Sequence, residues 1–301
     1  MAGHSHSHRT GAVLIVSLIL TCAFVIGETI AGIRAHSLAL LSDAGHNFTD
    51  AIALTLAGVG YFWQSRPGNQ SKTFGYHRMG VLAAFVNALL LAALAMALFY
   101  ESYRRLVHPE PVTESIMIWV AAIGLVLNLA IAWSLDGNRG DLNLRAAWVH
   151  MLGDAASCVG IIAGAILIYF TGWLAIDPLL SILIGAAIVW TAWDIFKDSI
   201  NILLEGLPKG LKLSEVTRAI RQVGGVIDVH DLHIWSLGSE AHALSCHVLI
   251  EDMPPSESDS ILRSVNRVLG GIFHIHHTTI QFEHVRCVLA DGSCTVGKHS
   301  H

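Results

Sequence analysis

Two pairs of ionisable side chains interrupt stretches that are otherwise apolar enough to span a membrane. His46 and Asp50 are four residues apart, and His150 and Asp154 repeat this spacing about 100 residues later. On a helix the spacing places both side chains of a pair on one face. Two such helices facing each other would supply two imidazoles and two carboxylates, which is a tetrahedral ligand set for zinc or a similar divalent ion.

The membrane setting decides how these pairs are interpreted. In a soluble helix a single histidine is usually an ordinary core or surface residue. In a bilayer, an ionised aspartate near the centre costs about 2.5–3.5 kcal/mol on insertion scales and is rare without a partner or a water-filled path. Two pairs at the same spacing in apolar stretches therefore indicate a metal site.

The composition is that of a membrane protein with a soluble part. Of the 301 residues, 53% are hydrophobic and only 14% are charged, and the mean hydropathy is +0.56. The net charge of −5 lacks the excess of Lys and Arg that a phosphate-binding face needs, which argues against nucleic acid as a partner. Five scattered cysteines give no disulfide framework.

Six apolar stretches are each long enough to cross a bilayer, for which a helix needs about 20 residues. We therefore predict a polytopic α-helical membrane domain with six transmembrane helices. Glu28 lies late in the first stretch, where we expect a helix-end carboxylate near the membrane interface. The predicted spans are 12–33, 38–63, 79–100, 116–135, 144–170 and 174–204.

Positive charge favours an orientation with both termini in the cytoplasm, because short cytoplasmic loops carry an excess of Lys and Arg. The charges on the side of the N-terminus are Arg9, Arg66, Lys72, Arg78, Arg139 and Arg145, against Arg34, Arg104 and Arg105 on the other side.

The chain after the sixth span changes character. The apolar runs shorten to the lengths of strands and amphipathic helices, and Ser214 is the expected N-cap of the first helix. The predicted order is helix 214–223, strand 226–237, strand 243–251, helix 256–269 and strand 278–285, which is a split β-α-β pattern. The expected division is a His-rich tail at 1–11, a membrane domain at 12–206, a cytoplasmic domain at 207–290 and a tail at 291–301.

Several longer motifs are distinctive: S-L-A-L-L-S-D-A-G-H-N-F-T-D, F-G-Y-H-R-M-G-V-L-A-A-F-V-N-A opening the third span, H-M-L-G-D, D-P-L-L-S-I-L-I-G, and V-H-D-L-H-I-W and H-T-T-I-Q-F-E in the tail. Together they resemble those of the cation diffusion facilitators, a family of divalent-metal/proton exchangers. The resemblance covers nearly the whole chain and implies a six-helix membrane domain, a ferredoxin-like α+β cytoplasmic domain and a homodimer.

The resemblance also implies roles for individual residues. His46, Asp50, His150 and Asp154 match the ligands of the family's transport site, and two His with two Asp resemble its zinc-selective branch. Asp43 matches a family position as well, but four-coordination does not need it, so we expect an access-path or helix-packing carboxylate.

A second zinc site is implied in the cytoplasmic domain, where Zn²⁺ would act as a regulatory ligand. His230, His247 and Glu283 match zinc-binding positions of family members, although they could also be polar strand residues at a dimer surface. Gln281 and Glu283 should share a strand face because residues two apart do so. His233 should face the opposite way from His230 unless a bulge intervenes.

Weaker candidates lie elsewhere. His77, at the mouth of the third span, matches an interfacial zinc position of some relatives, but a lone His after Tyr76 is more often a membrane-interface residue. Cys287 and Cys294 are seven apart, which is not the tight Cys-x-x-Cys spacing of a zinc knuckle. The loop at 136–143 lacks the long His-rich insertion of many eukaryotic relatives, so we expect a bacterial inner-membrane protein.

The sequence thus predicts a zinc/proton antiporter that exports metal ions by alternating access, and not an enzyme. Ligand imidazoles must be neutral and carboxylates ionised to bind metal, so protons and zinc compete for the same groups. One alternative is a passive divalent-cation channel, since pore-lining carboxylates also bind cations. Another is an intramembrane metallohydrolase, which needs an open coordination position and a general base; four ligands and the lack of a His-Glu-x-x-His motif disfavour it.

Overall fold

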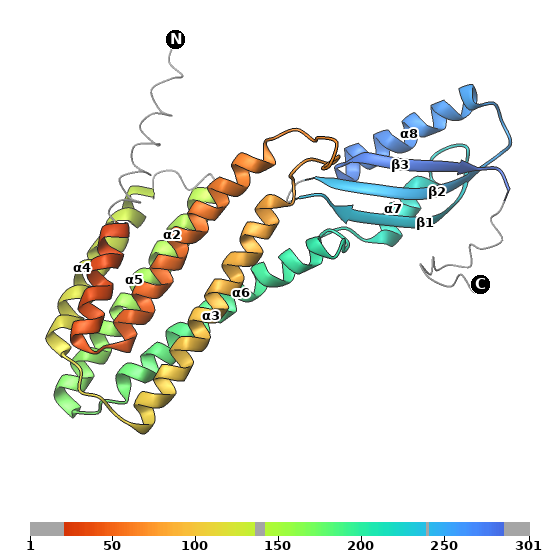
Figure 1. Ribbon diagram of the computed structural model, residues 1–301. Helices are drawn as coiled ribbons and strands as arrows, with labels where there is room; N and C mark the ends of the chain where they lie inside the picture. The colour runs from red at the N-terminus through yellow and green to blue at the C-terminus, as the bar shows by residue number, and fades with distance from the viewer. Residues whose placement is uncertain (1–20, 136–141, 239–240, 286–301) are drawn as a thin grey trace, which may run out of the picture. The chain divides into compact units, whose positions relative to one another are not determined.

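The computed structural model describes residues 21–135, 142–238 and 241–285 (Figure 1). The chain forms two compact units. The first comprises the described residues up to Leu56 and from Val86 to Phe196. The second comprises Ala57–Phe85 and the described residues from Lys197 onward. The predicted tails lie outside the described residues.

Five long helices follow the predicted spans closely, and a further helix is described at residues 21–35. Within the described residues, α3 to α6 are long and apolar enough to cross a membrane. Helix α2 has 27 residues, but its polar side chains at and around the predicted metal ligands lower its hydropathy, and it is not among these four. The helices are α2 (Leu38–Gln64), α3 (Met79–Val107), α4 (Glu114–Leu135), α5 (Leu142–Thr171) and α6 (Ile176–Leu203).

Small residues let the helices of the first unit approach closely, as is common in membrane domains. Gly164 of α5 shows why: a Cβ there would lie 2.2 Å from Cδ1 of Leu180 in α6. One buried apolar cluster joins α2, α4 and α5 and includes Ala39, Leu40, Met117, Ala121, Ile161 and Ala165. A second joins α3 and α6 and includes Leu91, Ala95, Leu98, Ile188 and Ala192.

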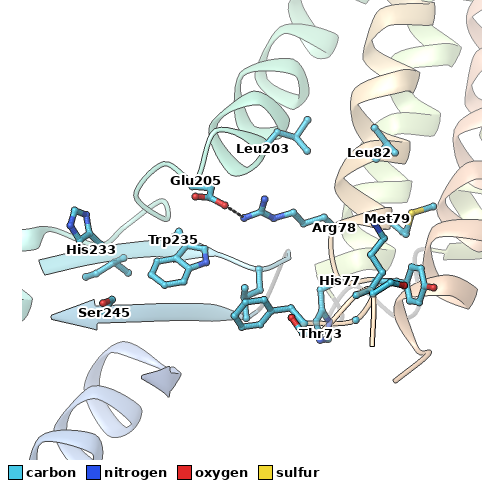
Figure 2. Close-up of a pocket in the computed structure, with 17 residues that line it drawn as sticks. Thr73, His77, Arg78, Met79, Leu82, Leu203, Glu205, His233, Trp235 and Ser245 are labelled. Atoms are coloured by element: carbon cyan, nitrogen blue, oxygen red, sulfur yellow. Dashed lines mark hydrogen bonds and ion pairs between the residues drawn. The ribbon is translucent and has the colours of Figure 1, made fainter. Parts of the chain in front are cut away.

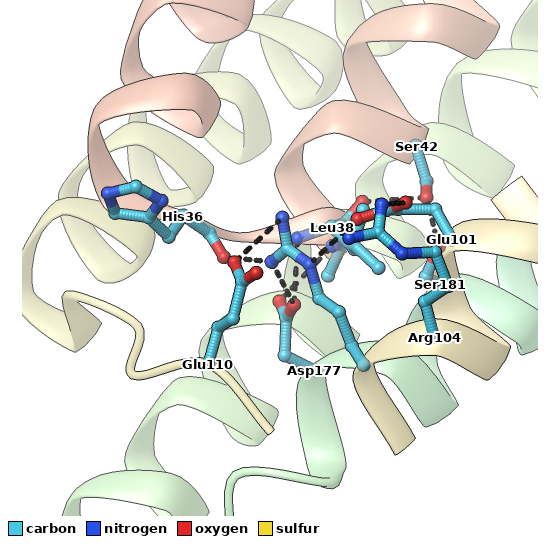
Figure 3. Close-up of polar contacts among 10 residues, drawn as sticks. His36, Leu38, Ser42, Glu101, Arg104, Glu110, Asp177 and Ser181 are labelled. Carbon is cyan, nitrogen blue, oxygen red and sulfur yellow. Dashed lines mark hydrogen bonds and ion pairs between the residues drawn. The ribbon is translucent and has the colours of Figure 1, made fainter. Parts of the chain in front are cut away.

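A carboxylate from another helix fixes the start of α2. Asp177, in the first turn of α6, accepts hydrogen bonds from the backbone N–H of Leu38 at 2.7 Å and of Ala39 at 3.2 Å. The Ser37 hydroxyl donates to the same carboxylate at 2.6 Å. These are the orphan donors that a helix N-terminus must satisfy, so α6 holds the end of the helix that carries His46 and Asp50 (Figure 3).

The second unit contains a three-stranded sheet and two helices, in the predicted order. The sheet order is β1-β2-β3, with β1 antiparallel to β2 and β2 parallel to β3. The elements are α7 (Leu213–Arg221), β1 (Val226–Ser236), β2 (His242–Ile250), α8 (Pro255–Phe273) and β3 (Ile275–Glu283) (Figure 1).

The predicted N-cap of α7 is wrong. The helix begins at Leu213 and its N-cap is Lys212, which makes no side-chain cap hydrogen bond. The Lys212 carbonyl accepts the backbone N–H of Glu215 and of Val216, and the Lys212 ammonium lies 2.9 Å from Glu215. Because the backbone turn already closes at Lys212, Ser214 lies inside the helix.

The two faces of the sheet differ in chemistry. On β2, the alternate residues Leu244, Cys246 and Val248 are completely buried in one core with Val265 and Leu269 of α8. The residues between them lie on the opposite face, because side chains alternate along a strand. That second face carries the polar cluster described below.

Candidate metal sites

The structure brings the four predicted transport-site residues together where α2 faces α5. Asp50 Oδ2 lies 3.1 Å from His150 Nε2 and 3.6 Å from His46 Nε2. Asp154 lies 3.6 Å from His46 Nε2 through Oδ1 and 3.7 Å from His150 Nε2 through Oδ2. The imidazole rings are 5.8 Å apart between centroids at an interplanar angle of 75°. Each carboxylate therefore contacts both imidazoles.

Each of these four distances is close to the edge of a zinc coordination tetrahedron, and the two contacts of Asp154 use different oxygens. One ligand atom from each of His46, His150 and Asp154 lies within 4.8 Å of the other two, a group that does not include Asp50. With metal–ligand bonds of about 2.0–2.1 Å, tetrahedral ligand atoms lie about 3.4 Å apart. The buried Oδ2 atoms of Asp50 and Asp154 have no hydrogen-bond partner. Buried polar oxygens of this kind are costly unless a donor or a cation satisfies them. Three of the four residues, His46, His150 and Asp154, thus lie close enough together to share a divalent ion, and Asp50 lies beside them at His150.

The four side chains are unequally accessible. Asp154 is only 5% exposed and His46 18%, whereas Asp50 is 31% and His150 42% exposed. His150 and Asp50 consequently form the more accessible side of the site, and Asp154 forms its floor.

A second cluster lies on the polar face of the three-stranded sheet. Glu283 bridges two histidines, with Oε2 3.1 Å from His230 Nε2 and Oε1 3.0 Å from His247 Nδ1. The strand register pairs His230 with His247, and His247 with Gln281. The Gln281 amide donates to Glu283 at 3.0 Å, so the predicted common face of these two residues is confirmed. One nitrogen or oxygen from each of His230, His247 and Glu283 lies close enough to share an ion.

A β-bulge enlarges this cluster. Strand β1 is irregular between His230 and His233, and Asp231 within the bulge has a φ of 51°. Since His233 pairs with Ser245, two residues from the partner of His230, it returns to the same face. Asp231 Oδ1 lies 2.9 Å from His233 Nε2, and Oδ2 lies 3.8 Å from His247 Nε2. Asp231 was not predicted from the sequence. Aspartate is one of the residue types that adopt positive φ more readily than most.

His77 joins neither cluster among the residues that the structure describes. It lies in the turn before α3 and lines a pocket of about 940 Å³ together with Arg78, Glu205 and Trp235 (Figure 2). Arg78 Nη2 lies 3.1 Å from Glu205 Oε1. His233 also lines this pocket, whereas His230, His247, Glu283 and the four transport-site residues do not. Cys287 and Cys294 lie outside the described residues.

Glu28 is not a helix-end carboxylate, and that expectation is wrong, because it lies inside the helix at residues 21–35. Its side chain is 1% exposed and lies against Asp43 and Asn47 of α2. A single sequence gives no sign of this, because the position of Glu28 along its helix does not reveal which neighbouring helix covers it.

Comparisons with known proteins agree with the two parts of the chain. Residues 14–204 match the cation efflux transmembrane domain, and residues 208–285 match the cytoplasmic domain of cation efflux proteins. The chain is 40% identical over 287 residues to the cadmium, cobalt and zinc/H(+)-K(+) antiporter of Bacillus subtilis, covering 92% of this chain and 91% of that protein.

Other relatives are similar over more than nine tenths of their length. The metal cation efflux system protein CzcD of Cupriavidus metallidurans is 40% identical over 97% of this chain and 93% of its own. The zinc transporter ZitB of Escherichia coli is 36% identical over 99% and 98%. A solved metal-bound C-terminal domain of CzcD from Cupriavidus metallidurans is 38% identical over 24% of this chain and 99% of that one, with a TM-score of 0.23.

The chain belongs to the cation efflux family, also called the cation diffusion facilitators. It is accordingly a membrane transporter of metal cations and not an enzyme. The prediction of the family from the sequence motifs is confirmed, and the metallohydrolase alternative is wrong.

Proposed function

We propose that this transporter exports Zn²⁺ from the cytoplasm in exchange for protons, with His46, Asp50, His150 and Asp154 binding the ion. The observation that carries the proposal is the set of four nitrogen–oxygen distances between 3.1 and 3.7 Å that joins these residues. The zinc and antiporter names of relatives that match over almost the whole chain support the choice of ion and of exchange.

Competition at this site couples the two ions. Each imidazole Nε2 faces two carboxylate oxygens, so a protonated histidine is stabilised there when zinc is absent. Zinc requires the same nitrogens to be neutral and the carboxylates to be ionised, and its binding releases the protons. If the site opens to one side of the membrane when it holds zinc and to the other side when it is protonated, switching between these two conformations exchanges the ions.

The proposal includes the topology predicted from the sequence. The helix at residues 21–35 and α2 join the four apolar helices to give six spans, with both termini in the cytoplasm of a bacterium and the membrane domain in its inner membrane. The sheet and its two helices form a ferredoxin-like cytoplasmic domain through which two copies associate. The match to the cytoplasmic domain of cation efflux proteins supports this assembly.

The cytoplasmic cluster is proposed to bind a regulatory Zn²⁺ through His230, His247 and Glu283. Its donors come from all three strands, so an ion there would tie the strands together and favour one geometry of the dimer. His77 is proposed as a further interfacial ligand on the basis of the family resemblance.

Zinc uptake into proteoliposomes, with and without an imposed proton gradient, tests the exchange. An antiporter accumulates zinc against its own gradient when the proton gradient is imposed, and loses that ability when a protonophore collapses it. A passive channel would instead carry zinc only down its concentration gradient, whatever the pH difference, and that result would overturn the proposal.

A further inference from the structure

Two carboxylates that the proposed transport site does not use are buried beside it. Glu28, in the helix at residues 21–35, and Asp43, in α2, are each 1% exposed. Their side chains lie within hydrogen-bonding reach of each other. Both carboxylate oxygens of Glu28 and Oδ1 of Asp43 have no hydrogen-bond partner. Two ionised carboxylates can only accept, so in that form neither can satisfy the other.

The surroundings supply little compensation. Asn47 lies against Glu28, and the Cys158 thiol is 3.9 Å from Asp43 Oδ2. The titratable groups that face the pair are His46 on α2 and Asp154 and Cys158 on α5. Among the residues that the structure describes, no lysine or arginine pairs with Glu28 or Asp43, and no hydrogen bond or ion pair joins them to the transport-site ligands.

A shared proton resolves this arrangement better than a metal ion does. Two like charges in contact in a buried site do not both ionise, and one proton held between them satisfies an oxygen of each. Hard metal cations need about six oxygen ligands. Beside Glu28 lie the side chains of Asp43 and Asn47, which offer fewer oxygens than such an ion needs.

We propose that Glu28 and Asp43 form a proton-binding site, separate from the metal ligands, that gives up its proton when zinc binds at the transport site. This inference rests on the proposed function. The O–H bond of the shared carboxyl breaks, the proton passes to solvent, and both carboxylates remain ionised. The divalent charge nearby stabilises that form, and its departure restores the proton. The pair therefore adds an exchanged proton without adding a zinc ligand.

Proton release on zinc binding tests this directly. Zinc chloride is added to the full-length protein in detergent, in weakly buffered solution with a pH indicator, and protons and bound zinc are both counted. Glu28→Gln resembles the protonated acid in shape, and its amide can still donate to Asp43, so a purely structural hydrogen bond survives. The variant should bind zinc but release about one proton fewer per transport-site zinc than the wild type. An unchanged count would overturn the proposal.

The infrared difference spectrum of zinc binding gives an independent test on the wild-type protein. Zinc should remove the C=O stretching band of a protonated carboxyl, and Glu28→Gln should lack that change. A wild-type spectrum without the loss would contradict the proposal even if the variant failed to fold. A third outcome would also overturn the proposal. If both proteins release equal numbers of protons, and zinc binding depends on potassium in the wild type but not in Glu28→Gln, the carboxylate pair binds a monovalent metal ion instead of a proton.

Asp154→Ala separates this inference from the proposed function. If that variant binds zinc and releases protons as the wild type does, the transport site itself is misplaced. If it loses transport-site zinc while Glu28→Gln releases as many protons as the wild type, only the inference about the carboxylate pair fails.

Discussion

Arg105 of α3 and Asp177 of α6 form a buried ion pair that lies at the start of α2. Arg105 Nη1 lies 3.8 Å from Asp177 Oδ2, and the two side chains are 11% and 0% exposed. Arg105 also donates to the backbone carbonyl of His36, while the Asp177 carboxylate accepts the N–H of Leu38. Three helices therefore meet at one carboxylate (Figure 3). Because α2 carries two transport-site ligands, this junction helps to set their position.

Removing the carboxylate at that junction should destabilise the membrane domain. Asp177→Ala deletes the cap of α2 and removes the fully buried partner of Arg105, which keeps Glu101 at 3.6 Å, so the melting temperature in detergent should fall by about 5 °C or more. Glu110→Ala is the matched control, since Glu110 lies 3.8 Å from the same arginine but is 46% exposed, and its removal should shift the melting temperature little. Equal melting of Asp177→Ala and the wild type would contradict the role of the junction.

The cytoplasmic cluster should lose its metal affinity when the bridging carboxylate is neutralised. Glu283→Gln removes the one group that contacts both histidines, and zinc affinity should fall by about tenfold or more. Zinc titration of the full-length protein measures this in an Asp154→Ala background, which silences the transport site. His284→Ala, at the next and exposed position, should titrate like its parent; if Glu283→Gln does so too, the regulatory site is elsewhere.

The β-bulge should depend on the residue at its left-handed position. Asp231 has a φ of 51°. Asn also tolerates this left-handed conformation, whereas for Ala it costs about 1 kcal/mol. Asp231→Ala should therefore speed hydrogen exchange of the β1 and β2 amides, and Asp231→Asn should leave it nearly unchanged. Similar protection in both variants would show that the bulge does not rely on this side chain.

The buried thiol of the cytoplasmic core should make the protein less stable at alkaline pH. Burial raises the pKa of Cys246 from 9.0 to about 12. Since the folded pKa is the higher one, the stability this thiol contributes is complete below pH 9 and is lost as the pH rises toward 12. Between pH 9 and pH 10 the wild type should lose about 1 kcal/mol relative to Cys246→Ala. If the free energy of unfolding changes equally in the two proteins between pH 9 and pH 10, the raised pKa of Cys246 is contradicted.

Long elements with a strong pattern could be predicted from the sequence. The starts of α2 and α3 and the end of α4 lie where the apolar runs place them, and the order of elements in the cytoplasmic domain is as expected. The pairing of His46 with Asp50 and of His150 with Asp154 also followed from helical spacing alone, because residues four apart share a face.

The features that depend on contacts between distant segments could not be predicted. Burial of Glu28 depends on which helix packs beside it, and the cap of α2 comes from Asp177, 139 residues away. The bulge at Asp231 breaks the alternation on which strand reasoning relies. At α7 the backbone hydrogen bonds of Lys212 took precedence over the side-chain preference of Ser214.

Zinc transport by Asp154→Ala tests the central claim most directly. Asp154 is the most buried ligand and contacts both imidazoles, so its loss removes a charge that the ion requires. We expect proton-driven zinc uptake into proteoliposomes to fall to the level of protein-free vesicles, while Asp259→Ala, on the surface of α8, transports like the wild type. Uptake by Asp154→Ala at the wild-type rate and with the same dependence on the proton gradient would show that zinc crosses the membrane at a different site.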